Sequence, residues 1–124
     1  MKSWKDDPRA DTNPVFNDNA LKLGVFALNG IGNNMSNAPE NLDAKWDDSV
    51  FLSKLSEEAG FEANVPYSRW RGYVDADPGH RSGLALDSYT WAAATSQVTS
   101  AAVFATSHVP TIHPIAAAKQ CATI

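Results

Sequence analysis

Two histidines near the carboxyl-terminal end of the sequence are candidates for acid–base or metal chemistry. His108 and His113 stand five residues apart, with a predicted loop and no carboxylate between them. Metal sites in proteins gather several ligands at characteristic short spacings, so this pair is a poor metal signature and predicts no metal site. His108 stays a candidate for a catalytic contact with substrate or cofactor. His113 directly precedes Pro114 and is expected to cap a helix.

Further polar side chains follow apolar segments of the chain. Asn29 and Gly30 follow LKLGVFAL, the cluster YSRWRGY (67–73) follows FEANVP, and Thr106 and Ser107 follow AVFA. If the apolar segments are parallel strands, their carboxyl ends lie at the same edge of the sheet, which is where active sites of α/β barrels are found. We therefore expect the functional site at this edge.

Gly30 and Gly32 invite a different interpretation, a dinucleotide-binding loop between a strand and a helix. The third glycine of that fingerprint is missing, because Met35 stands in its place. The next predicted helix also begins too late for its amino end to face a pyrophosphate, and Asp47 and Asp48 in its first turn would repel phosphate. The sequence therefore disfavours a dinucleotide site.

The apolar segments predict three strands, at residues 21–28, 61–66 and 102–105. The last of them is a continuous apolar run without alternation, which is typical of a parallel strand covered on both faces.

Helical signals follow each predicted strand. Asp43 is expected to cap the first helix, and Gly60 to end it in a left-handed conformation. Asp87 or Ser88 is expected to begin the second helix, and Pro114 the third, where its missing N–H costs nothing. The residues expected to form the buried stripe of the first helix are Trp46, Val50, Phe51, Leu55 and Ala59. The order βαβαβα predicts a parallel sheet.

The composition indicates one globular domain of modest size. The chain has 124 residues, 44% of them hydrophobic and 19% charged, with a net charge of −4. Lysine and arginine do not cluster, which argues against a nucleic-acid surface. Cys121 is the single cysteine, so no internal disulfide is expected. No signal peptide and no apolar run long enough to span a bilayer is visible, and we expect a cytoplasmic protein without membrane or nucleic-acid partners.

Three strand–helix units leave both edges of a sheet open. Parallel sheets are usually buried on both faces, so either the helices cover both faces or the rest of a larger sheet is absent. A (β/α)8 barrel needs roughly 250 residues, about twice the length of this chain. We favour the second interpretation, an α/β fold in which residues 21–124 form the N-terminal βαβαβα portion of an incomplete TIM-type (β/α)8 barrel. Residues 1–20 are polar and are expected to form a mobile extension.

Six segments of the sequence resemble the luciferase-like flavin-dependent monooxygenases. They occur in the order seen in that family, lie within residues 21–124, and read LKLGVFALN, EEAGFEA, PYSRWRGY, SYTWAAA, FATSHVPTIHP and AAAKQCATI. No single segment is diagnostic, and the resemblance lies in their joint order and spacing. It is strongest to the branch of dimethyl-sulfide monooxygenase-like and pyrimidine monooxygenase-like enzymes. The fold of the family is a TIM-type barrel, which agrees with the βα order expected from the residues.

The resemblance implies a two-component oxygenase. A separate flavin reductase supplies reduced FMN, which reacts with O2, and one oxygen atom is inserted into a small organic substrate such as an organosulfur or nitrogen compound. The flavin carries the difficult chemistry, while the protein positions it and excludes water. A homo-oligomer is an option for the full-length enzyme.

The resemblance also implies roles for residues at the predicted strand ends. Ser68 and Arg69 match flavin-contacting positions, where a guanidinium would stabilise the anionic reduced ring. For Arg69 a solvated surface position is the alternative. The hydroxyl of Thr106 is expected to bond a nitrogen or carbonyl of the flavin ring. Some relatives have a functional histidine where this chain has residues 68–70, so no catalytic histidine is carried over. The residues expected to line the substrate pocket are Asn29, Trp70 and Tyr73, with a core position as the alternative for the two aromatics.

Two alternatives to the monooxygenase stay open. One is a truncated, non-catalytic remnant of such an enzyme, and the other is a deazaflavin-dependent oxidoreductase on the same fold. In barrels of this type, loops after the seventh and eighth strands commonly hold the flavin phosphate. Because this chain lacks those units, we expect it to be inactive alone and to bind FMN poorly or not at all.

Overall fold

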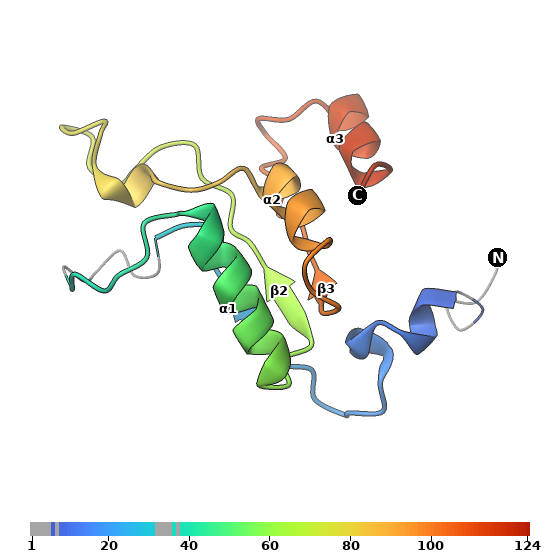
Figure 1. The fold of residues 1–124 in the computed structure, drawn as a ribbon. Coiled ribbons are helices and arrows are strands. Elements are labelled where there is room, and N and C mark those ends of the chain that lie inside the picture. Colours follow the sequence, from blue (N-terminus) through green and yellow to red (C-terminus); the bar gives the residue numbers. More distant parts are fainter. Residues whose placement is uncertain (1–5, 7, 32–35, 37) are drawn as a thin grey trace.

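The computed structural model describes residues 6, 8–31, 36 and 38–124. Its centre is a three-stranded parallel sheet in the order β1-β2-β3 (Figure 1). The strands are β1 (Gly24–Phe26), β2 (Ala63–Val65) and β3 (Ala102–Val103). They lie inside the three predicted segments but are shorter, since only these residues pair in the ladder. The carboxyl ends of all three strands point to one edge of the sheet.

Three α-helices follow the strands, α1 (Trp46–Glu58), α2 (Ser88–Thr95) and α3 (Pro114–Cys121). The predicted α/β class and βαβαβα order are therefore confirmed. Short 3-10 helices occur at η2 (Pro8–Asp11), η3 (Pro14–Phe16) and η4 (Arg81–Gly83). No helix in the described ranges has the length and apolar character needed to cross a membrane.

Most of the predicted helix ends are correct. The Asp87 carboxylate accepts a hydrogen bond from the Thr90 N–H at 2.9 Å and caps α2. The His113 ring accepts one from the Ile115 N–H at 3.2 Å and caps α3 at its first residue, Pro114. Gly60, after α1, has a φ of 87°, the left-handed conformation predicted for it.

The predicted cap of α1 is wrong. The residue at the N-cap position is Lys45, whose side chain makes no capping bond, and Ala44 before it has a φ of 56°. This left-handed residue separates Asp43 from the helix. The Asp43 carboxylate instead lies 3.0 Å from the Arg81 guanidinium.

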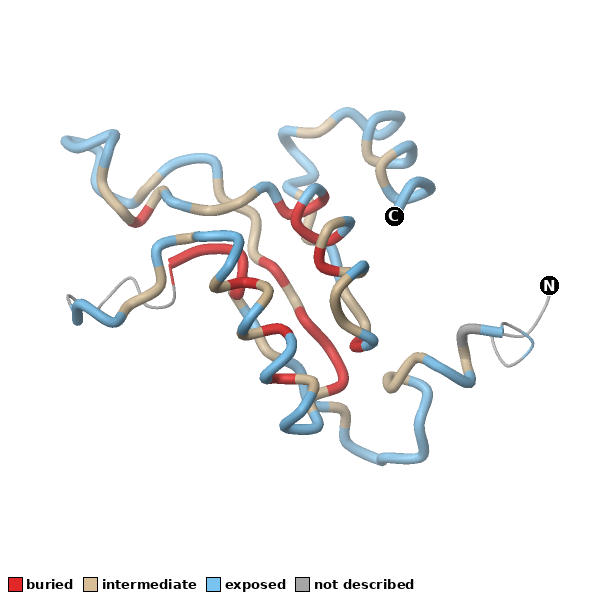
Figure 2. The backbone as a smooth tube through the Cα atoms, in the orientation of Figure 1, coloured by how far each residue is buried: buried red, intermediate tan, exposed pale blue. Residues whose placement is uncertain are grey.

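The core lies between the sheet and the helices α1 and α2, which cover the same face (Figure 1). Leu28, Trp91 and Ala92 are buried there, with Val25 and Val103 packed against them from the strands. Figure 2 shows the buried residues concentrated along β2 and the inner sides of the two helices.

The opposite face of the sheet is open. Side chains alternate between the two faces of a strand, so the neighbours of Val25 and Val103 point away from the helices. Two of these neighbours, Phe26 and Phe104, are 64% and 48% exposed. The prediction that the third strand is covered on both faces is therefore wrong for this structure.

The face on which α1 packs also differs from the prediction. Its predicted stripe points largely outward, with Phe51 64% and Leu55 47% exposed, whereas Ser49, Ser53 and Ser56 are buried against the sheet. For Ser49 and Ser56 the physical reason is that this side of the sheet presents polar partners. The Ser49 hydroxyl donates to the Leu28 carbonyl at 2.6 Å, and the Ser56 hydroxyl lies 3.2 Å from the buried Asn64 side-chain oxygen.

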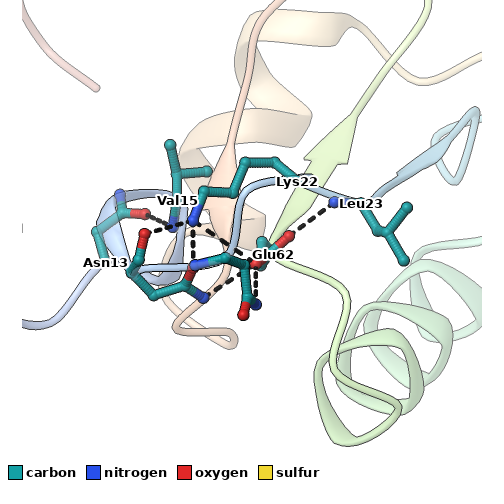
Figure 3. A network of polar contacts seen from close by, with 7 residues as sticks. Asn13, Val15, Lys22, Leu23 and Glu62 are labelled. Carbon is teal, nitrogen blue, oxygen red and sulfur yellow. Dashed lines mark hydrogen bonds and ion pairs between the residues drawn. The ribbon is translucent and has the colours of Figure 1, made fainter.

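A carboxylate organises the amino end of the sheet (Figure 3). Glu62 is only 3% exposed, and its oxygens accept hydrogen bonds from the side chains of Asn17 and Asn19, at 2.9 and 2.7 Å, and from the Leu23 N–H at 2.7 Å. The Lys22 ammonium lies 3.8 Å away. Glu62 thereby joins the segment before β1 to the start of β2. The mobility expected for residues 1–20 stays a prediction.

We predict that acid weakens this attachment. Hydrogen bonds from Asn19 and Asn17, then from the Leu23 N–H, hold the pKa of Glu62 below its ordinary value of 4.5, against the opposing effect of burial. A lowered pKa in the folded state stabilises the fold above that ordinary value, and the stabilisation is lost as the pH falls through the folded pKa.

The stability advantage of the wild type over Glu62→Gln should therefore shrink between about pH 7 and about pH 3 in urea unfolding series. Glu58→Gln, at an exposed position in the last turn of α1, serves as the control and should show no such convergence. A Glu62→Gln difference that is constant across the pH range would contradict the role given to the carboxylate.

Candidate functional site at the carboxyl ends of the strands

A pocket of about 110 Å³ lies at the carboxyl ends of β2 and β3. Four of the residues predicted to contact substrate or cofactor line it: Ser68 and Trp70 from the segment after β2, and Thr106 and His108 from the segment after β3. Segments far apart in the chain are thus brought together because parallel neighbouring strands end at the same edge. The remaining lining residues are Asp87, Tyr89, Ser107, Thr111, Ile112 and Gln120.

A second pocket, of about 250 Å³, adjoins the first. The two share Ser68, Trp70 and Asp87, and the second is also lined by Arg69. Ligand pockets usually enclose about 300–1,000 Å³, so neither pocket alone is large enough for a flavin.

Thr106 connects the ends of the two strands. Its hydroxyl lies 2.6 Å from the carbonyl oxygen of Pro66, directly after β2. A carbonyl can only accept a hydrogen bond, so the Thr106 hydroxyl must donate its hydrogen there. The Thr106 oxygen keeps lone pairs and can still accept a bond from a ligand.

Arg69 is neither a free anion-binding group nor a solvated surface arginine. Its guanidinium carbon lies 4.5 Å from the ring centre of Tyr67 and 4.4 Å from that of Tyr73. The same guanidinium donates to the carbonyl oxygen of Ser82 at 2.7 Å and to the Tyr73 hydroxyl. Arg69 thus clamps the segment between β2 and α2, and it places positive charge at the second pocket.

We predict that Arg69→Lys destabilises this segment. A lysine keeps the charge but loses the planar group that stacks on both rings and bonds in two directions. The expected cost is about 1–2 kcal/mol, together with faster amide exchange at Tyr73. Hydrogen exchange read by NMR checks this result. Arg71→Lys is the matched control, since Arg71 is exposed and pairs with the nearby, exposed Asp75. Equal effects of the two substitutions would contradict the clamp.

The structure places Asn29 and Tyr73 outside both pockets. Asn29 is completely buried, and its amide donates to the carbonyl oxygens of Tyr67 and Leu86 at 2.7 and 2.9 Å and accepts from the Tyr67 N–H at 3.0 Å. It braces three segments and has no hydrogen left for a substrate. Tyr73 is 65% exposed and stacks on Arg69.

Gly30 has a spatial role beside the pockets. A Cβ atom at this position would lie 1.7 Å from the Tyr67 hydroxyl oxygen. Tyr67 donates that hydroxyl to the Leu84 carbonyl at 3.1 Å, and burial raises its pKa, so the phenol is neutral. Gly30 is therefore accounted for by packing rather than by phosphate binding. Gly32 and Met35, the other positions of the disfavoured dinucleotide fingerprint, lie outside the described residues.

Sequence reasoning missed three residues near the pockets. Ser88 bonds the backbone of Thr106 and was considered only as a helix start. Tyr89 and Gln120 line the first pocket from α2 and α3, and the buried Gln120 side-chain oxygen has no hydrogen-bond partner in the part of the chain that the structure describes. The position of Ser88 at the start of α2, beside the strand ends, was the one usable signal. Nothing in the sequence distinguishes Gln120.

A larger but more open hollow lies away from the predicted site residues. An open hollow of about 540 Å³ at the opposite end of the sheet is lined by Lys54, Glu57 and the 97–100 turn. There the Glu57 carboxylate accepts bonds from the Thr99 hydroxyl at 2.7 Å and from the Ser100 N–H, so it secures the turn. Within the described part of the chain, no three His, Cys, Asp or Glu side chains gather as a metal site.

Comparison with known proteins gives one match. The model of the luciferase-like monooxygenase family matches residues 21–124, which include all three strands, all three α-helices and both pockets. No curated protein matches the chain, and no solved structure does. The chain therefore belongs to the luciferase-like monooxygenase family, whose members are flavin-dependent oxidoreductases.

Proposed function

We propose that this chain is the N-terminal part of a two-component monooxygenase that uses reduced FMN and O2 to oxygenate a small organic substrate. The observation that carries the proposal is the grouping of Ser68, Trp70, Thr106 and His108 around one pocket at the carboxyl ends of β2 and β3. In the family to which the chain belongs, flavin chemistry is the common feature. A separate reductase would supply the reduced flavin.

The protein groups at the pocket can hold a flavin ring in a defined orientation. Because the Thr106 hydroxyl donates to Pro66, its oxygen can only accept, and a ring N–H is the partner it can serve. Of the two partners that the sequence left open, a ring nitrogen or a carbonyl, we therefore propose a ring nitrogen that carries a hydrogen. Ser68 adds a second hydroxyl to the wall, and Trp70, which is 71% exposed, adds an apolar surface that can stack or exclude water.

Arg69 has an electrostatic role in this proposal. Reduced flavin is anionic, and a guanidinium at the adjoining pocket favours its binding by Coulomb attraction. The Tyr67 and Tyr73 rings fix the guanidinium in place, so the charge is held there before any ligand arrives. When bound, the flavin supplies the oxygen-transfer chemistry, and the protein residues bind, orient and exclude water.

The proposal also includes a longer sheet. The exposed Phe26 and Phe104 lie on the face that further strands would close over in a barrel, and both pockets are smaller than a flavin requires. Further βα units would complete the wall and hold the phosphate. We propose that the chain belongs to the branch of dimethyl-sulfide monooxygenase-like and pyrimidine monooxygenase-like enzymes, because its six sequence segments occur in the order seen there.

A titration tests the cofactor and the role of Thr106 together. Under anaerobic conditions, reduced FMN is added up to millimolar concentration and the tryptophan fluorescence is followed, because Trp70 lines the pocket. We expect Thr106→Val to weaken binding about tenfold and Thr123→Val, at an exposed position just after α3, to leave it unchanged. Equal affinities of all three proteins would overturn the role of Thr106. Tighter binding of a reduced deazaflavin would replace FMN by that cofactor.

A further inference from the structure

Thr106 lies beyond the sheet ladder. β3 ends at Val103, and the last backbone bond from this segment to β2 is donated by the Phe104 N–H to the Asn64 carbonyl at 3.0 Å. The backbone of Thr106 therefore needs another partner if the residue is to keep a fixed place at the pocket.

A single side chain supplies that partner. The Ser88 hydroxyl accepts a hydrogen bond from the Thr106 N–H at 2.9 Å and donates one to the Thr106 carbonyl at 2.5 Å. Ser88 is the first residue of α2 and only 2% exposed. A hydroxyl can donate one hydrogen and accept at its lone pairs, so both polar groups of Thr106 are satisfied by one small group.

We propose that Ser88 is a positioning residue that holds Thr106 in the orientation required for ligand binding. Ser88 lines the adjoining second pocket but not the pocket of Thr106, which its hydroxyl reaches through the two bonds to the Thr106 backbone. With the backbone fixed on one side by Ser88, the Thr106 hydroxyl reaches Pro66 on the other, and its oxygen is kept as an acceptor. The claim that Ser88 affects flavin binding rests on the proposed function. The claim that Ser88 fixes the backbone of Thr106 does not.

The first test measures the coupling directly. In the 124-residue chain, Ser88→Ala should speed exchange of the Thr106 amide about tenfold relative to the Trp91 amide, which donates to the carbonyl of Asp87, the N-cap of α2. Ser88→Thr keeps the hydroxyl and should restore slow exchange. If Ser88→Ala does not fold, Ser88→Cys, with a weaker donor of similar size, should give a smaller increase in the same direction.

Ser49 offers a matched control. It is also a buried serine of a helix whose hydroxyl donates to a backbone carbonyl near a strand end, that of Leu28 at 2.6 Å. Ser49→Ala should lower the overall stability similarly but leave the relative exchange rate of Thr106 unchanged. Unchanged exchange at Thr106 in Ser88→Ala, or the same change in Ser49→Ala, would overturn the coupling.

The second test asks whether the coupling serves the ligand. In the anaerobic titration with reduced FMN, Ser88→Ala and Thr106→Val should each weaken binding, and the double variant should be no weaker than Thr106→Val alone. Additive losses would overturn the positioning of the hydroxyl by Ser88. If the wild type shows no binding at millimolar FMN, as expected where the units that hold the phosphate are missing, the exchange measurement decides the coupling on its own.

Discussion

Replacing Gly30 with alanine is expected to displace Tyr67 and to destabilise the fold by about 1–3 kcal/mol or more, as overpacking of a buried site does. The added Cβ would lie 1.7 Å from the Tyr67 hydroxyl oxygen and 2.3 Å from the ring carbon that bears it. The ring cannot give way without losing its bond to Leu84 and its stacking on Arg69. Urea unfolding followed by circular dichroism measures the loss.

Two further variants identify the cause. Gly79→Ala should change stability by less than about 0.5 kcal/mol, because its nearest neighbour is an Asp77 oxygen at an ordinary 3.5 Å. In a Tyr67→Ala background the Gly30→Ala substitution should cost far less, since the obstructing ring is absent. If Gly30→Ala lowers the stability as much in that background as in the wild type, Gly30 is needed for a reason other than room for Tyr67.

Replacing Trp91 with alanine is expected to cost about 3–5 kcal/mol, the range seen when a large aromatic side chain is removed from a core. Trp91 is 2% exposed and lies at the centre of the cluster that joins α2 to the sheet. The free energy of unfolding of a domain is roughly 5–15 kcal/mol, so this substitution would remove a large part of it. Urea unfolding followed by circular dichroism checks this.

Trp91→Phe separates packing from hydrogen bonding. The indole N–H of Trp91 is buried and has no hydrogen-bond partner among the described residues, so Trp91→Phe removes no such bond and loses only part of the packed volume. We expect a cost of less than half that of alanine. A similar cost for both variants would mean that the indole N–H has a partner on which the core depends.

The order of elements and several of their ends could be predicted from local residue chemistry. Asp87, His113 and Gly60 act where capping rules place them, because a cap depends on a few neighbouring residues. The prediction that Asp43 caps α1 was wrong because one left-handed residue, Ala44, changes the direction of the chain before the helix.

The packing of α1 was mispredicted because apolar residues were assumed to face the sheet. The serines at positions 49, 53 and 56 also recur at helical spacing, and this signal was available in the sequence. The burial of Ser49 and Ser56 depends on partners elsewhere in the chain, the Leu28 carbonyl and the Asn64 side chain. A hydrophobicity pattern carries no information about such partners.

The location of the candidate site followed from topology, whereas its details did not. Ser68, Thr106 and His108 meet at one pocket because parallel strands bring their carboxyl ends together. The clamp on Arg69 involves Tyr73 and Ser82, which come near only once the segment after β2 has folded back. Local spacing could not indicate that contact.

The central claim is that the pocket at the carboxyl ends of β2 and β3 receives a reduced flavin, and amide shifts in NMR spectra test it most directly. Reduced FMN is added anaerobically, to millimolar concentration, to the 15N-labelled chain. We predict that the largest shifts occur at the amides of Ser68, Trp70, Thr106 and His108, which line that pocket. Shifts concentrated instead around Glu57 and the 97–100 turn, with none at the pocket, would contradict the account.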